Sequence, residues 1–107
     1  MRFTRSNWKK FFDGSNKQTT IRLKISRIGH NKAYEPSFFI PVLLGEFDIK
    51  KIIRKPYGSL TEEDSILDGF KTLAELKAEL ERLYGKLLPE TIIFQHWISN
   101  AKKEIMI

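Results

Sequence analysis

Polar and apolar side chains alternate strictly from Thr20 onward. The polar set is Thr20, Arg22, Lys24 and Ser26, and the apolar set between them is Ile21, Leu23 and Ile25. A period of two residues is typical of a β-strand that buries one face and exposes the other. We therefore predict a strand over residues 19–26 in a sheet that covers a core. Thr20 and Arg22 lie side by side on its polar face.

A turn precedes this strand and ends in a lysine. Gly14, Ser15 and Asn16 favour turn conformations, and Lys17 follows them, three residues before Thr20. We expect Lys17 to fold back toward the polar face of the strand and to face a solvated cleft there. On spacing alone, a lysine, a threonine and an arginine on one strand face more often form a simple solvated surface.

Start and stop residues predict helices in three places. The first helix is expected to begin at Ser6, a good N-cap residue, and to end at Asp13-Gly14. The next two are expected to begin at Thr61 and Thr72, each followed three residues later by an acidic residue as in a capping box. A glycine ends each of these two helices, which separates them from the segments that follow.

The last of these helices carries an apolar stripe at helical spacing. Its members are Leu73, Leu76, Leu80, Leu83 and Tyr84. The first helix carries an aromatic face made of Trp8, Phe11 and Phe12. We interpret both sets as core, because an amphipathic helix buries its apolar stripe.

Three further segments are expected to be extended. Residues 36–41 hold a short apolar run between two prolines, which predicts a loop with a short edge strand because proline cannot donate to a ladder. Residues 45–54 alternate until the phase slips at Lys50-Lys51, which predicts a β-bulge. Residues 92–98 are apolar on both faces, as in a central strand.

Length and composition exclude several kinds of chemistry. The 107 residues suffice for one modest core, so we assign residues 1–107 to a single domain. The chain has no cysteine, which excludes disulfides, thiolate nucleophiles and cysteine-ligated zinc. With His30 and His96 as its two histidines, we predict no metal site and no cofactor. His96 is interpreted as a core histidine, since it lies in an apolar strand.

No stretch of the sequence is apolar for long enough to form the centre of a signal peptide or a membrane span. The phosphate-loop pattern Gly-x-x-x-x-Gly-Lys-[Ser/Thr] is also absent, which argues against a nucleoside triphosphatase. We therefore predict a cytoplasmic protein with no membrane partner.

Charge is distributed unevenly along the chain. Residues 1–57 hold 13 Lys and Arg against 4 Asp and Glu, whereas residues 58–107 hold 6 against 9. The first half thus carries a net charge of +9 and the second a net charge of −3. A cationic surface favours a polyanionic partner, because binding phosphates releases condensed counterions. Solubility is the alternative explanation of such an excess.

Two segments resemble the ASCH domain family of the PUA-like superfamily. Gly14, Lys17, Thr20 and Arg22, following a helix, are similar to the family pattern Gly-x-Lys-x-x-Thr-x-Arg, with one more residue between the glycine and the lysine. Residues 61–70 resemble the ASCH segment in which a short helix ends at an acidic residue and a glycine, here Asp68 and Gly69. The resemblance covers nearly all of the chain.

The resemblance implies an α+β fold of the PUA-like kind. Such a fold is a partly open β-barrel of about five or six strands, with about three helices packed around it. In this family the residues that match Lys17, Thr20, Arg22 and Asp68 converge on a cleft between the helices and the barrel. The cationic half of the chain is expected to surround that cleft.

A binding module is the first function that the resemblance implies. Its basic cleft would hold RNA, a nucleoside or a nucleotide, with Lys17, Arg22 and Lys24 contacting phosphate or a base edge. Tyr34 or Tyr57 would stack on an unpaired base, as aromatic side chains do in single-strand recognition. The alternative for each tyrosine is a packing role.

An enzyme is the second function, since some compact ASCH proteins are amidohydrolases that remove the acetyl group from N(4)-acetylcytidine. Lys17, Thr20 and Asp68 match their Lys, Thr and carboxylate. Thr20 would be the nucleophile, Lys17 its base after burial or a nearby cation lowers the lysine pKa, and Asp68 the proton shuttle. Asp68 is one methylene shorter than the usual glutamate. Its alternative role is that of a residue ending a helix.

Overall fold

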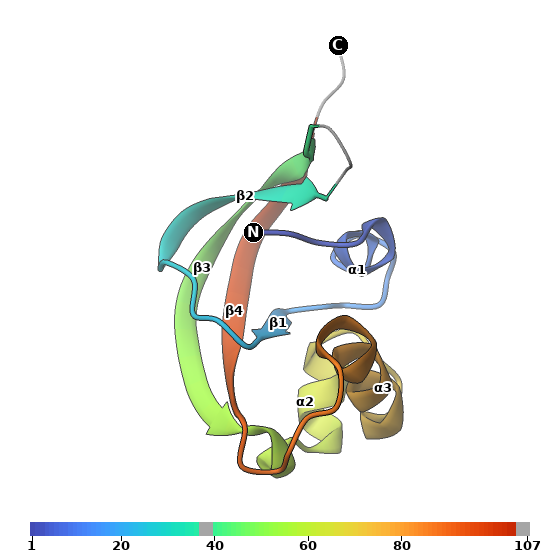
Figure 1. Cartoon of the computed structure of the whole chain (residues 1–107). Coiled ribbons are helices and arrows are strands. Elements are labelled where there is room, and N and C mark those ends of the chain that lie inside the picture. Colours follow the sequence, from blue (N-terminus) through green and yellow to red (C-terminus); the bar gives the residue numbers. More distant parts are fainter. Residues whose placement is uncertain (37–39, 105–107) are drawn as a thin grey trace.

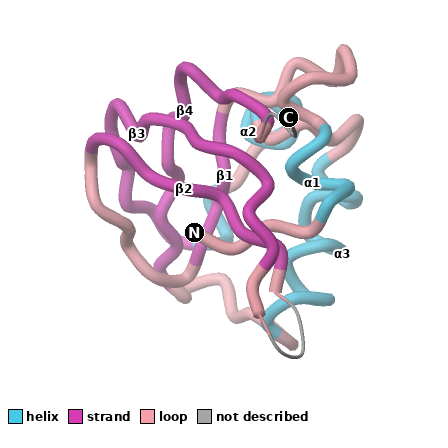
Figure 2. The backbone as a smooth tube through the Cα atoms, turned by 90° about the horizontal axis from the view of Figure 1, so that it is seen from above, coloured by secondary structure: helices cyan, strands magenta, loops and turns pink. Residues whose placement is uncertain are grey.

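One curved antiparallel sheet organises the chain, and its strands follow the order β1-β4-β3-β2. The computed structural model describes residues 1–36 and 40–104. Its strands are β1 (Thr19–Arg22), β2 (Gly29–Glu35), β3 (Val42–Pro56) and β4 (Ile92–Lys103). Its helices are α1 (Arg5–Lys9), α2 (Glu62–Leu67) and α3 (Leu73–Tyr84), with a 3₁₀ turn, η1, at Tyr57–Ser59. Figures 1 and 2 show the strands in one half of the molecule and the helices in the other.

The two long strands, β3 and β4, give the sheet its curvature. Their register shifts between Glu46 and Asp48 and again between Ile49 and Lys51. Each shift places an extra residue in one strand, which bends it and increases its twist. The second shift confirms the bulge predicted at Lys50-Lys51.

β1 is shorter than the alternation predicts. It pairs with β4 from Thr19 to Arg22 and then leaves the sheet, although the alternating pattern continues to Ser26. The chain bends at residues 23–24, and the backbone N–H of Ser26 then donates to Nε2 of His96 at 3.0 Å. Ile25, predicted to face the core, is consequently 62% exposed.

The helices begin largely where their caps predict. Thr61 and Asp64 form a complete capping box at α2, and the Thr72 side chain accepts from the backbone N–H of Glu75 at α3. α1 differs, because Thr4 rather than Ser6 provides the cap, and the helix ends at Lys9. The residues between Lys9 and Gly14 form turns rather than helix.

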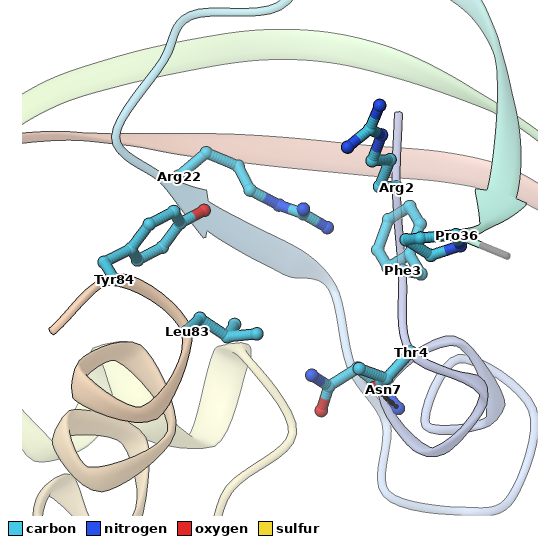
Figure 3. A pocket seen from close by; sticks show the side chains of 8 residues that line it. All are labelled: Arg2, Phe3, Thr4, Asn7, Arg22, Pro36, Leu83 and Tyr84. Carbon is cyan, nitrogen blue, oxygen red and sulfur yellow. Dashed lines mark hydrogen bonds between the residues drawn. The ribbon is translucent and has the colours of Figure 1, made fainter. Parts of the chain in front are cut away.

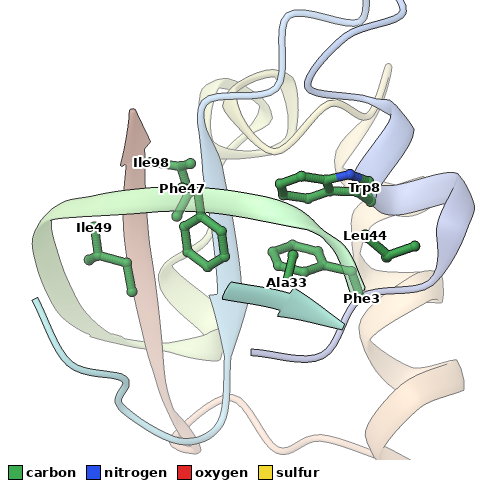
Figure 4. Close-up of a cluster of buried hydrophobic side chains, with 7 residues drawn as sticks. All are labelled: Phe3, Trp8, Ala33, Leu44, Phe47, Ile49 and Ile98. Carbon is green, nitrogen blue, oxygen red and sulfur yellow. The ribbon is translucent and has the colours of Figure 1, made fainter. Parts of the chain in front are cut away.

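Two apolar clusters lie on opposite faces of β4. Ile98 belongs to a cluster that includes Phe3, Trp8, Ala33, Leu44, Phe47 and Ile49 (Figure 4). Ile93 belongs to a second cluster with Ile21, Tyr57, Leu60, Leu76 and Leu80. Ile93 and Ile98 are an odd number of positions apart, so they point to opposite faces of the strand. Trp8 of α1 thus packs on one side of β4, and Leu76 and Leu80 of α3 pack on the other.

The apolar stripe of α3 is only partly a core stripe. Leu76 and Leu80 are buried, as predicted, but Leu83 and Tyr84 are 44% and 36% exposed. The last turn of α3 extends past the second cluster, and its two apolar residues lie instead beside a pocket described below.

The α+β class is confirmed, whereas the predicted barrel of five or six strands is not. The described ranges hold a four-stranded open sheet whose edge strands, β1 and β2, are not neighbours. The expected edge strand between Pro36 and Pro41 falls on residues 37–39, which lie outside the described residues. Within residues 1–36 and 40–104, no helix is long and apolar enough to span a membrane.

The first residues of the chain line up beside β2. Arg2 forms a parallel bridge with Tyr34, and the backbone N–H of Phe3 donates to the Tyr34 carbonyl at 2.8 Å. In return, the Tyr34 N–H donates to the carbonyl of Met1 at 2.9 Å. This short pairing brings residues 2–4 within reach of the end of β1.

Candidate functional site

Thr20 and Arg22 share one face of β1, as the alternation predicts. The Arg22 Nε donates to the Thr20 hydroxyl at 3.1 Å. Thr19 points to the opposite face, where its hydroxyl donates to Asp68 Oδ1 at 3.3 Å. β1 therefore separates two groups of polar side chains, one around Arg22 and one around Asp68.

Arg22 extends into a pocket of about 330 Å³, the Arg22 pocket (Figure 3). Four segments contribute its lining: the N-terminal residues with α1, the end of β1, the residue that follows β2, and the last turn of α3. The lining residues are Arg2, Phe3, Thr4, Asn7, Arg22, Pro36, Leu83 and Tyr84.

The guanidinium of Arg22 is held in place from two directions. Its Cζ lies 4.6 Å from the centroid of the Phe3 ring, a distance at which a cation is attracted to an aromatic face. Tyr84 lies beside the same side chain (Figure 3). Burial lowers the pKa of Arg22, while Tyr84 and then Asp68 oppose that shift. The site therefore holds a partly desolvated cation in a fixed orientation.

The Arg22 pocket is cationic. Arg2 and Arg22 both line it, and none of its described lining residues is acidic. Within residues 1–36 and 40–104, neither arginine forms a salt bridge with a carboxylate. Two positive charges with no acidic side chain in the described lining favour an anionic ligand.

Lys17 and Asp68 form a buried ion pair on the other side of β1. The Lys17 Nζ lies 3.1 Å from Asp68 Oδ1 and also donates to the Asp68 backbone carbonyl at 2.9 Å. The two side chains are 2% and 7% exposed. The expectation that Lys17 faces a solvated cleft is therefore wrong, because the turn before β1 directs it inward against α2.

Burial shifts both members of this pair toward neutrality. It lowers the pKa of Lys17 and raises the pKa of Asp68, and the attraction between the two opposes each shift. Taking a charged group out of water costs on the order of several kcal/mol per ion. A nearby opposite charge offsets this cost only when the geometry of the pair is good. The two contacts of Lys17 with Asp68 provide that geometry.

Asp68 occupies the C-cap of α2 and joins that helix to the turn before β1. Beside it, the backbone N–H of Gln18 donates to the Leu67 carbonyl at 2.7 Å. Gly69 has φ +87°, and a Cβ there would lie 3.1 Å from the Cβ of Lys17. The segment carrying Asp68 is thus tightly packed against the turn, as expected of a helix-end residue with a structural role.

The catalytic candidates Lys17, Thr20 and Asp68 do not form one hydrogen-bonded triad. Lys17 contacts Asp68, but the Thr20 hydroxyl accepts from Arg22 on the other face of β1. Thr19 takes the position beside Asp68 that the resemblance implies for Thr20. Thr19 and Thr20 are adjacent in sequence, and strand alternation directs their hydroxyls to opposite faces of β1.

The other predicted ligand-binding residues lie apart from the Arg22 pocket. Lys24 is exposed in the bend after β1. Tyr34 is half-buried in β2, and its side chain is not among the described lining of the pocket. Tyr57 is 5% exposed within the second apolar cluster, a location that favours packing.

Neither histidine belongs to the pocket. His96 is fully buried; its Nε2 accepts from the Ser26 N–H, and its Nδ1 contacts the Thr20 carbonyl at 3.2 Å. Burial lowers its pKa, consistent with a neutral core histidine. His30 is exposed and lies 3.3 Å from Asp48 and 3.4 Å from Glu46. Among the described residues no group of histidine and acidic side chains fits a metal ion.

Several pocket residues were not predicted from the sequence. Arg2, Phe3 and Asn7 come from the N-terminal segment, and Tyr84 was expected in the core. The net positive charge of residues 1–57 predicted a cationic site, but it did not indicate which arginines would line that site. No local pattern links residue 2 with residue 84.

The fold is an α+β domain built on an open antiparallel sheet. A solved structure with a similar fold is known. The chain is similar to the crystal structure of protein EF3133 from Enterococcus faecalis V583, family-model DUF984, with a TM-score of 0.60 and 13% identity. The match covers 89% of this chain and 66% of that protein, so the chain spans just under two thirds of its length. No family model and no curated protein matches the sequence. At this identity the likeness shows the fold alone.

Proposed function

We propose that this chain is an ASCH-type domain that binds RNA or a nucleotide, and that the ligand enters the Arg22 pocket. One observation carries the proposal: Arg22 is held by Thr20 and Phe3 in a pocket that contains a second arginine, and none of the described residues that line it is acidic. Arginine is suited to this role, because its planar fork matches the oxygens of a phosphate.

The lining of the pocket also suits a base or a sugar. Phe3, Leu83 and Tyr84 offer apolar and aromatic surface beside the arginines. Tyr84 is 36% exposed, so part of its ring can contact an unpaired base. Aromatic stacking and cationic contacts together are typical of single-strand binding. The excess charge of residues 1–57 would add attraction for further phosphates.

We expect a short fluorescent single-stranded RNA to bind the wild-type chain, with an affinity that falls as salt rises from about 50 to 200 mM. The slope of log affinity against log salt should be near −0.7 for each phosphate contacted. Arg22→Gln should weaken binding by at least about tenfold, because it removes a charge-assisted contact of about 1.5–3 kcal/mol. Fluorescence anisotropy measures both effects.

Arg54→Gln is the matched control, since Arg54 is exposed on β3 and does not line the pocket. Arg54→Gln should change the salt dependence of RNA binding only slightly and should retain most of the affinity for RNA. Thermal melts establish that each variant is folded. Equal losses in the two variants would argue for nonspecific attraction, and absence of binding at low salt would remove the proposal.

An amidohydrolase acting on N(4)-acetylcytidine is the second candidate, favoured by one observation. Burial lowers the pKa of Lys17, the direction that a general base requires, and Lys17 contacts the carboxylate of Asp68. A hydroxyl would have to be delivered to this pair. Thr19 lies beside it, whereas Thr20 would need to exchange its bond with Arg22.

Paired hydroxyl variants test this activity. If the chain is an amidohydrolase with Thr20 as nucleophile, Thr20→Val should abolish release of cytidine from N(4)-acetylcytidine while Thr19→Val retains it, because a nucleophile and its base act as a unit. Asp68→Glu should hold or raise the rate if Asp68 shuttles the proton. Chromatography of the wild-type reaction over about pH 6 to 9 decides the matter. If the reaction yields no cytidine above the uncatalysed background, binding of RNA or a nucleotide is the one candidate function that remains.

A further inference from the structure

We propose that the Arg22 pocket selects a terminal phosphomonoester, either of a free mononucleotide or of the phosphorylated end of an RNA strand. This inference rests on the proposed function and specifies which part of the ligand enters the pocket. It follows from the charge balance around the pocket, the orientation of Arg22 and the way the pocket is bounded.

Three acidic side chains that adjoin or contact lining residues are Glu35, Asp68 and Glu79, and each is already paired with another cation. Glu35, next to the lining residue Pro36, accepts from the Arg5 Nε at 3.0 Å. Asp68, the carboxylate that acts on Arg22, is held by Lys17 at 3.1 Å. Neither is therefore available to neutralise the cations of the pocket.

Glu79 is committed in the same way. It accepts two hydrogen bonds from Arg82 and a third, at 2.8 Å, from the side-chain amide of the lining residue Asn7. The pocket is thus left with the two positive charges of its arginines. A phosphodiester supplies one negative charge, whereas a phosphomonoester supplies about −1.5 to −2 at pH 7. The monoester is the better electrostatic match.

The orientation of Arg22 leaves its terminal amino groups directed into the pocket. Its Nε is used by the Thr20 hydroxyl at 3.1 Å, and its plane lies close to the Phe3 ring. Figure 3 shows the end of the side chain reaching the space between Phe3 and Leu83. Tyr84 also hydrogen-bonds this guanidinium, and the donors that it leaves free form a planar edge that suits the oxygens of one phosphate.

The pocket is bounded on two sides in a way that suits the end of a strand. Residues 2–4 form one wall, tied to β2 by the bond from the Phe3 N–H to the Tyr34 carbonyl. Leu83 and Tyr84 form the opposite wall. Its volume of about 330 Å³ lies near the lower end of the usual range of about 300–1,000 Å³ for small-molecule sites. That space suits one nucleotide better than a continuous strand.

The test compares ligands that differ only at the end. One RNA sequence is prepared with a 5′-phosphate, a 3′-phosphate or hydroxyls at both ends, and adenosine monophosphate is compared with adenosine. We expect at least one phosphate-ended ligand to bind about tenfold more tightly than its hydroxyl counterpart at constant salt. Arg2→Gln and Arg22→Gln should each remove this difference, and Arg54→Gln should preserve it.

The outcomes separate this inference from the proposed function. Equal binding of phosphate-ended and hydroxyl-ended RNA would overturn the terminal selection and leave RNA binding intact. Binding of adenosine monophosphate without RNA would support the inference and identify a free mononucleotide as the ligand. Preference for one phosphorylated RNA end would identify the strand terminus. If neither RNA nor mononucleotide binds, both proposals fail.

Discussion

Lys17→Met is expected to lower the free energy of unfolding by about 3–5 kcal/mol. The substitution keeps an unbranched side chain in the space but leaves the Asp68 carboxylate buried without its partner. Lys17 contributes two contacts there, to the carboxylate at 3.1 Å and to the backbone carbonyl at 2.9 Å. Urea denaturation followed by circular dichroism measures the change.

Two further variants show whether the loss comes from the unpaired charge. Adding Asp68→Leu to Lys17→Met should recover much of the stability, because an apolar pair of similar size is often no worse than a buried ion pair. Arg5→Met breaks the pair with Glu35, in which the arginine side chain is 66% exposed, and should cost about 1 kcal/mol or less. A loss of that small size for Lys17→Met would mean that its ammonium is solvated.

Leu76→Ala is expected to destabilise the chain by about 2–5 kcal/mol, as a deletion in the core does. Leu76 is fully buried and belongs to the cluster that joins α3 to β1 and β4. Removing its branched end leaves a cavity next to Ile21 and Ile93, and a sheet face can relax into it only in part. Chemical denaturation gives the magnitude.

Leu83→Ala on the same helix is the control. Leu83 is 44% exposed, so its truncation should cost about 0.5 kcal/mol or little more. Both substitutions have the same effect on helix propensity. The difference between them therefore reports burial, and similar losses in both would contradict the assignment of Leu76 to the core.

The local features of the fold could be predicted because they depend on neighbours in sequence. The caps at Thr61 and Thr72, the bulge at Lys50-Lys51 and the shared face of Thr20 and Arg22 all follow from patterns a few residues long. Each pattern indicates either a local backbone conformation or the periodicity of a helix or strand. These local properties do not depend on which distant segments of the chain come into contact.

The composition of the pocket could not be predicted, because it depends on which segments meet. Arg2 lines the same pocket as Arg22 because the first residues pair with Tyr34, and no periodic pattern in the sequence indicates that pairing. Lys17 was misplaced for a related reason: charge and a preceding turn suggested solvent, but the end of α2 lies directly against that turn. Burial of a charged residue is decided by its partner, and here that partner is 51 residues away in sequence.

The position of β1 at the edge of the sheet has a consequence for when the ligand site can form. Its neighbour there is β4, the last strand, so Thr20 pairs with His96 across most of the chain. Contacts of such long sequence separation form late in folding, after the entropy of closing the loop has been overcome. A chain still emerging from the ribosome would lack the strand that fixes Arg22. Only the completely folded chain would then bind the ligand, and the ligand would stabilise that native state without stabilising partly folded chains.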